Sequence, residues 1–247
     1  MPRRFHSQQH SAIVDKNTYA ECKKRQYLLN LFHVPNIKLT DNMIQYAMAR
    51  LSENFAKTIL NKTKLVAKRR KMERVMSELA DYQSGTQPAT ETIVNIARYP
   101  RTGPMIKTMI YKELQDNMVE ESAPTVQADP VSIRLQNVAG LFNLAKAEQE
   151  LLFLLFLCET DRLVDTVMDE LFEQMDILRS SNPAVNVKPY SMLTGLPRSD
   201  LEQAMKKESS LIGCGLVSND QEPVGYGLIA SLNSGYSFTV WLSRRLG

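Results

Sequence analysis

The sequence has few of the residues from which catalytic and metal sites are usually built. Its 247 residues include three histidines, three cysteines and one tryptophan, and the histidines all precede residue 34. The cysteines are Cys22, Cys158 and Cys214, an odd number without paired spacing. That usage excludes a disulfide framework and indicates thiols kept reduced. We therefore expect a cytoplasmic protein with no metal site and no catalytic thiol–histidine pair.

Motifs for cofactors, nucleophiles and membranes are missing as well. The sequence contains no GxxxxGK[ST] phosphate loop, no GxGxxG fingerprint, no HExxH zinc motif and no GxSxG nucleophile elbow. Its longest apolar run, Leu151–Cys158, is far shorter than the roughly 20 residues that cross a membrane. These absences predict a protein that is not an enzyme, that holds no cofactor and that does not enter a membrane.

What the sequence does have is a strongly uneven charge. The overall net charge is +3, but residues 1–80 contain 16 basic and 6 acidic side chains, a net +10, and the remainder carries −7. A split of this kind indicates that the first part of the chain meets an acidic partner.

The basic charge is concentrated in Asn61–Arg74, with the sequence NKTKLVAKRRKMER. A dense basic helix can bind phosphates without sequence preference, because neutralising the phosphates releases counterions. The same segment could instead meet an acidic protein surface or simply be solvated. The candidate nucleic-acid-binding residues in it are Lys62, Lys64, Lys68, Arg69, Arg70, Lys71 and Arg74.

Helical periodicity runs through the first half of the chain. Thr40-Asp41 is typical of a helix start, and apolar residues then recur at helical spacing from Met43 to Phe55. We expect one helix of several turns that continues to Ala80. Two more helices are predicted before residue 120, and a segment with little apolar periodicity follows. The predicted domains are a basic helical domain at 1–120, a linker at 121–135 and a second domain at 136–247.

The second domain is predicted to open on two apolar helices. Leu151–Leu157 is apolar nearly all round, which is typical of a helix buried on most sides. Glu159–Leu178 has a regular apolar stripe and an acidic outer face, which we interpret as solvated surface. The acidic residues are Asp161, Asp165, Asp169, Glu170, Glu173 and Asp176.

Lys188–Val217 has the pattern of a helix-turn-helix. Gly195 can adopt the positive φ that ends a helix, and Pro197 suits the start of the next. Ser199 and Glu202 have the spacing of a capping box. On the second helix and just after it, Arg198, Gln203, Lys206 and Lys207 are candidate contacts to nucleic acid in the major groove.

Strand-like segments follow and predict a wing. Leu211–Val217, Gly225–Ile229 and Tyr236–Trp241 combine β-branched or aromatic residues with turn-forming neighbours. The expected fold class is therefore mainly α: a helical N-terminal lobe plus a C-terminal winged-helix (α+β) domain.

Two passages of the second domain carry a resemblance. They are AGLFNL at 139–144 with LLF at 151–153, and LTGLP at 193–197 with SLIGCGLV at 210–217. Over about residues 138–230 the chain resembles the region N-terminal to the ATPase module of bacterial AAA-type ATPases. The phosphate-binding loop of such ATPases is absent from this chain. The resemblance therefore implies an N-terminal portion of such an ATPase, or a relative without the motor.

Two functions follow from these patterns. The first is a non-catalytic module that binds nucleic acid, duplex DNA in particular, through the basic helix and the winged helix. The second is a regulatory or partner-recognition portion of an AAA-type ATPase that acts through contacts with another protein or with a second copy. Uneven charge and the helix-turn-helix pattern both favour the first.

Overall fold

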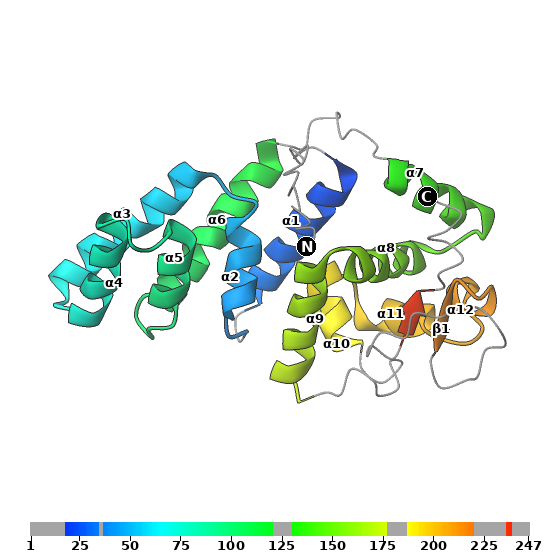
Figure 1. Cartoon of the computed structure of the whole chain (residues 1–247). Helices are drawn as coiled ribbons and strands as arrows, with labels where there is room; N and C mark the ends of the chain where they lie inside the picture. The colour runs from blue at the N-terminus through cyan, green and yellow to red at the C-terminus, as the bar shows by residue number, and fades with distance from the viewer. Residues whose placement is uncertain (1–17, 35–36, 121–129, 177–186, 220–235, 239–247) are drawn as a thin grey trace, which may run out of the picture.

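The computed structural model describes residues 18–34, 37–120, 130–176, 187–219 and 236–238, and these are almost entirely helical (Figure 1). The elements are α1 (Tyr19–His33), α2 (Asp41–Met48), α3 (Glu53–Arg69), α4 (Glu73–Gln83), α5 (Ala89–Ala97), α6 (Gly103–Glu120), α7 (Pro130–Leu141), α8 (Lys146–Thr160), α9 (Arg162–Gln174), α10 (Lys188–Thr194), α11 (Arg198–Ala204), α12 (Ser210–Gly213), β1 (Val217–Asn219) and β2 (Tyr236–Phe238).

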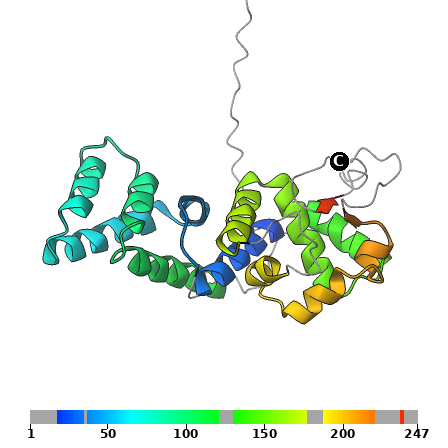
Figure 2. The ribbon, with the colours of Figure 1, turned by 90° about the horizontal axis from the view of Figure 1, so that it is seen from below.

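The molecule is elongated, and α1 lies near its middle (Figures 1 and 2). Helices α3 and α4 form one end, and α7, α11 and α12 lie toward the other. Helix α1 packs against α6 on one side and α10 on the other. Its buried face includes Tyr27, Leu28 and Leu31, each at most 2% exposed. The first described helix therefore joins both parts of the core.

The first half of the chain is helical, as the periodicity predicts, but it is divided. Thr40 caps α2 by accepting a hydrogen bond from the Met43 amide at 3.2 Å, which confirms the predicted helix start. The single long helix expected from there to Ala80 is wrong. Ser52 caps a new helix by accepting from the Phe55 amide at 3.1 Å, and a second break separates α3 from α4.

The predicted burial of the apolar helix in the second half is confirmed. Leu151, Leu154 and Leu157 of α8 are at most 2% exposed. Helix α9 packs along α8, and its Val164, Val167, Met168, Leu171 and Phe172 are buried as well. None of the described helices has the length and hydropathy that a membrane-crossing helix needs.

The predicted winged-helix domain is wrong, because the segment expected to open the wing is helical. Ser209 caps α12 by accepting from the Ile212 amide at 3.2 Å, and the Leu211 amide donates to the Glu148 carboxylate of α8 at 3.1 Å. These bonds satisfy free amides of a helix start. Among the described residues the strand pairing is a three-residue antiparallel ladder, with Val217 opposite Phe238. The predicted strand at Gly225–Ile229 lies outside the described residues.

The turn between α10 and α11 does form at Gly195, whose φ is 72°. No side chain caps α11, so the predicted capping box of Ser199 and Glu202 is also wrong. The Asn30 side chain of α1 donates a hydrogen bond to the Leu193 carbonyl in the last turn of α10 at 2.7 Å. Helix α1 therefore stabilises the C-terminal end of α10.

Gly195 allows a test of how closely α1 and α10 are packed. A Cβ at Gly195 would lie 2.9 Å from Asn30 Nδ2, whereas a Cβ at Gly85, which has a similar φ of 77°, would meet nothing within 4 Å. We expect Gly85→Ala to lower the free energy of unfolding by about 1 kcal/mol through left-handed strain alone. Gly195→Ala should cost about 2 kcal/mol, because the contact with Asn30 adds to that strain. Urea denaturation of both variants measures the difference, and equal losses would contradict the close packing.

Candidate nucleic-acid interface

Most of the basic side chains predicted to bind nucleic acid are gathered at the end of the molecule formed by α3 and α4 (Figure 1). Helix α3 buries one stripe, which includes Ile59, Thr63 and Ala67, and presents the opposite face to solvent. We call the seven cations the basic tip. Lys64 is half-buried, and the other six are exposed: Lys62, Lys68, Arg69, Arg70, Lys71 and Arg74.

The turn that carries the centre of the basic tip is fixed by backbone hydrogen bonds. The Met72 amide donates to the Ala67 carbonyl at 2.9 Å, and the Lys71 amide donates to the Lys68 carbonyl at 3.4 Å. This is the Schellman ending of a helix, in which the left-handed position is usually glycine. Here Lys71 occupies it with φ 53°, a conformation that costs a side chain about 1 kcal/mol. A cation therefore stands where glycine would be unstrained.

The basic tip has little acidic charge in its own segment, and Lys62 shares a pocket with Glu113 and Asp116 of α6. Within residues 62–74 the single acidic residue is Glu73. Leu65 lies on the same solvent face, between Lys62 and Lys68, and is 71% exposed. The surface is therefore a dense group of cations around one apolar side chain.

The second set of predicted contacts has a different character. Arg198, Gln203, Lys206 and Lys207 are all exposed, on α11 and the turn after it. Three acidic residues of the same segment are exposed too: Asp200, Glu202 and Glu208. The three cations are thus balanced by three carboxylates, so this surface attracts phosphate much less than the basic tip does.

The structure does not bring the two sets together. The basic tip lies at the α3–α4 end, and α11 lies beyond α1 toward the other end, in both views (Figures 1 and 2). One surface patch cannot include both, so the basic tip is the better candidate interface.

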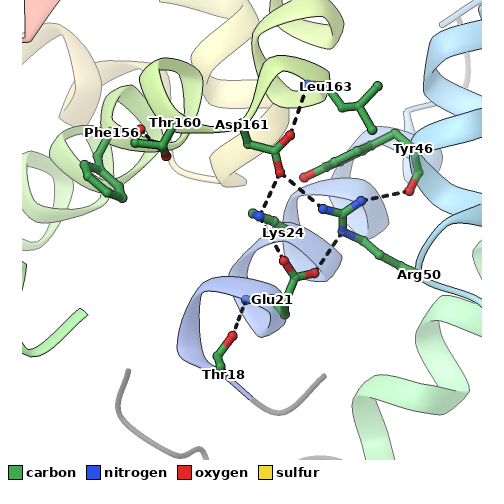
Figure 3. Close-up of polar contacts among 9 residues, drawn as sticks. All are labelled: Thr18, Glu21, Lys24, Tyr46, Arg50, Phe156, Thr160, Asp161 and Leu163. Atoms are coloured by element: carbon green, nitrogen blue, oxygen red, sulfur yellow. Dashed lines mark hydrogen bonds and ion pairs between the residues drawn. The ribbon is translucent and has the colours of Figure 1, made fainter. Parts of the chain in front are cut away.

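A cluster of charged side chains, which the sequence did not predict, joins three helical segments (Figure 3). Lys24 of α1 contacts the Asp161 carboxylate at 2.7 Å and Glu21 at 2.8 Å. Arg50, just after α2, contacts the same two carboxylates at 3.3 and 3.2 Å. Asp161 also accepts from the Leu163 amide at 3.0 Å and so caps α9. We call Glu21, Lys24, Arg50 and Asp161 the ion cluster.

Little of the ion cluster is open to solvent, since its side chains are 10–17% exposed. Burial alone would raise the pKa of Asp161, but Lys24 and Arg50 outweigh it and hold that pKa below its ordinary value. Arg50 also lies 3.9 Å above the Tyr46 ring. Each charge has a partner of opposite sign, so the cluster joins α1, the end of α2 and the start of α9 rather than offering a reactive group.

Asp161 and Glu170, which the sequence predicted on a solvated face, both have defined partners. The Glu170 carboxylate accepts hydrogen bonds from the Thr40 hydroxyl and, at 2.6 Å, from the Asn42 amide. The available signal was the position of Asp161 directly before a helix, where aspartate is a preferred cap. Its cationic partners lie over 100 residues away in sequence, so no local sequence pattern could predict them.

Among the described residues, no group of three or more histidine, cysteine, aspartate or glutamate side chains is placed to hold a metal ion. No protein-family model matches the chain, and neither a curated protein nor a solved structure is significantly similar to it.

Proposed function

We propose that this chain binds duplex nucleic acid, without sequence preference, through the basic tip. The observation that carries the proposal is the density of charge. Residues 62–74 contain seven cations, six of them exposed, and one carboxylate, and they lie at one end of the molecule. Duplex nucleic acid has the closely spaced phosphates that match such a group.

The geometry of the basic tip supports this ligand over a flat acidic protein surface. The α3–α4 turn lies at one end of the described structure, away from α7, α11 and α12, so a duplex that approaches this end does not meet those helices. The turn is held by hydrogen bonds before any ligand arrives, and this limits the entropy lost on binding. Lysine and arginine contacts to phosphate position a protein on the duplex but read no bases.

The test is binding of the whole chain to a labelled mixed-sequence duplex at ionic strengths from about 50 to 200 mM. If four or five phosphates are neutralised, the logarithm of the association constant should fall linearly with the logarithm of salt concentration, with a slope of about −4. A second duplex of unrelated sequence should bind equally well. Absence of binding at the lowest salt would contradict the proposal.

A second candidate function is the partner-recognition role implied by the resemblance to AAA-type ATPases. The observation that favours it is the exposure of apolar side chains on α7: Leu141 is 81% exposed and Ile133 is 42% exposed. Exposed apolar side chains mark protein contacts where they gather into one patch. Concentration-dependent self-association in sedimentation, together with no affinity for DNA, would favour this function over the first.

A further inference from the structure

A groove of about 850 Å³ lies between the start of α2, the α5–α6 turn and the end of α9. This volume falls in the range of small-molecule sites, roughly 300–1,000 Å³. Its lining combines apolar side chains, among them Leu39 and Tyr99, with charged and polar ones such as Lys107, Glu170 and Gln174.

Hydrogen bonds between distant segments hold the groove in shape. The Gln174 side-chain amide of α9 pairs with the Lys38 backbone, accepting from its N–H at 3.1 Å and donating to its carbonyl at 2.9 Å. The bonds from Thr40 and Asn42 to Glu170 join the same two segments. The groove is therefore formed before any ligand enters it.

Two of the five charged residues in the groove form an ion pair. Arg98 and Asp41 meet at the mouth, where their side chains are 62% and 42% exposed. Glu170 accepts two hydrogen bonds from neutral donors, which occupy its oxygens without neutralising its charge. Lys38 is exposed to solvent.

Lys107 of α6 is different. Its ammonium donates to the Val34 and Ile37 carbonyls, the latter at 3.4 Å, and makes no ion pair among the residues that the structure describes. A lysine ammonium has three N–H donors, so one remains for another acceptor. The side chain is half-buried, and this burial lowers the pKa of Lys107. An anion beside Lys107 would supply the missing charge.

We propose that this groove binds a small amphipathic anion, whose carboxylate pairs with Lys107 and whose apolar body lies against Leu39 and Tyr99. Pro100 and Pro104 extend the apolar surface on the α5–α6 side. Tyr99 also lines a smaller pocket with Lys71 and Arg74 of the basic tip. The inference rests on Lys107 and does not depend on nucleic-acid binding.

The experiment compares two ligands that share a hydrocarbon chain and differ in the head group, decanoate and decanol. Each is titrated against the full chain carrying the neutral fluorescent dye N-phenylnaphthylamine, and displacement of the dye reports binding. We expect decanoate to bind about tenfold more tightly than decanol, the effect of one hydrogen bond to a charged group. Equal affinities of the wild-type protein for the two ligands, or no displacement of the dye by either, would overturn the proposal.

Variants then assign the preference to Lys107. Lys107→Met should abolish the tenfold preference for decanoate and leave decanol binding unchanged. Lys112→Met removes an exposed lysine of the same helix outside the groove and should leave both affinities unchanged. An equal loss of decanoate and decanol binding in Lys107→Met would assign Lys107 a structural role only and would also overturn the proposal, as would a preference that persists in this variant.

Discussion

The affinity for mixed-sequence duplex DNA is expected to fall about a hundredfold at low salt when four cations of the basic tip are replaced together. The four are Lys68, Arg69, Arg70 and Lys71, each changed to alanine. Each phosphate contact contributes close to one unit of salt slope, so the slope should also shrink from about −4 to about −1. Fluorescence anisotropy of a labelled duplex across a salt series gives both quantities.

A matched variant separates the basic tip from net charge. Changing Arg198, Lys206 and Lys207 to alanine removes cations from α11 and the turn after it, where exposed carboxylates balance them. This variant should keep the wild-type slope and lose little affinity. If both variants weaken binding equally, the whole charge of the protein is responsible and the basic tip is not the interface. Since the four substituted tip residues are exposed, circular dichroism should show unchanged folding in both variants.

The largest effect on stability is expected for Asp161→Asn. At neutral pH this change should lower the free energy of unfolding by about 3 kcal/mol, because it leaves Lys24 and Arg50 short of a carboxylate in a mostly buried position. The loss should appear in urea denaturation as a lower midpoint with an unchanged slope. Glu173→Gln removes an exposed carboxylate from the same helix and should change stability by less than about 0.5 kcal/mol.

The same variant has a defined pH dependence. The pKa of Asp161 is lowered in the folded protein, so its charge stabilises the fold at pH values above the ordinary 3.8 of an aspartate. That stabilisation is lost as the pH falls through the lower, folded pKa. The difference between wild type and Asp161→Asn should therefore be constant from neutral pH to about pH 5 and shrink below about pH 4. A difference that grows on acidification would show that the ion cluster does not lower this pKa.

Local patterns predicted the features of this protein that depend on local forces. Thr40 caps α2, Gly195 takes a left-handed turn, and the apolar face of α8 is buried as its sequence indicates. Each follows from residues within a few positions of one another. The exposure of most of the basic tip belongs to the same class, because a segment with few apolar residues has little to bury.

Features that depend on distant partners were missed. Leu211–Val217 is too short a run for periodicity to distinguish strand from helix, and the Glu148 carboxylate that receives the Leu211 amide is 63 residues away. The ion cluster likewise joins α1 to α9 through side chains whose spacing shows no pattern. Lys107 reads as an ordinary surface lysine in sequence, and the groove around it exists only once α2, α6 and α9 have met.

The central place of α1 has a consequence for how the protein is made. On the ribosome α1 emerges before either helix that covers it, and its last partner, α10, follows more than 150 residues later. Until α10 has been made, the side chains of Tyr27, Leu28 and Leu31 cannot be fully buried. Contacts so far apart in sequence slow folding and leave apolar surface open to wrong associations. We therefore expect the nascent chain to need protection by chaperones until translation has passed α10.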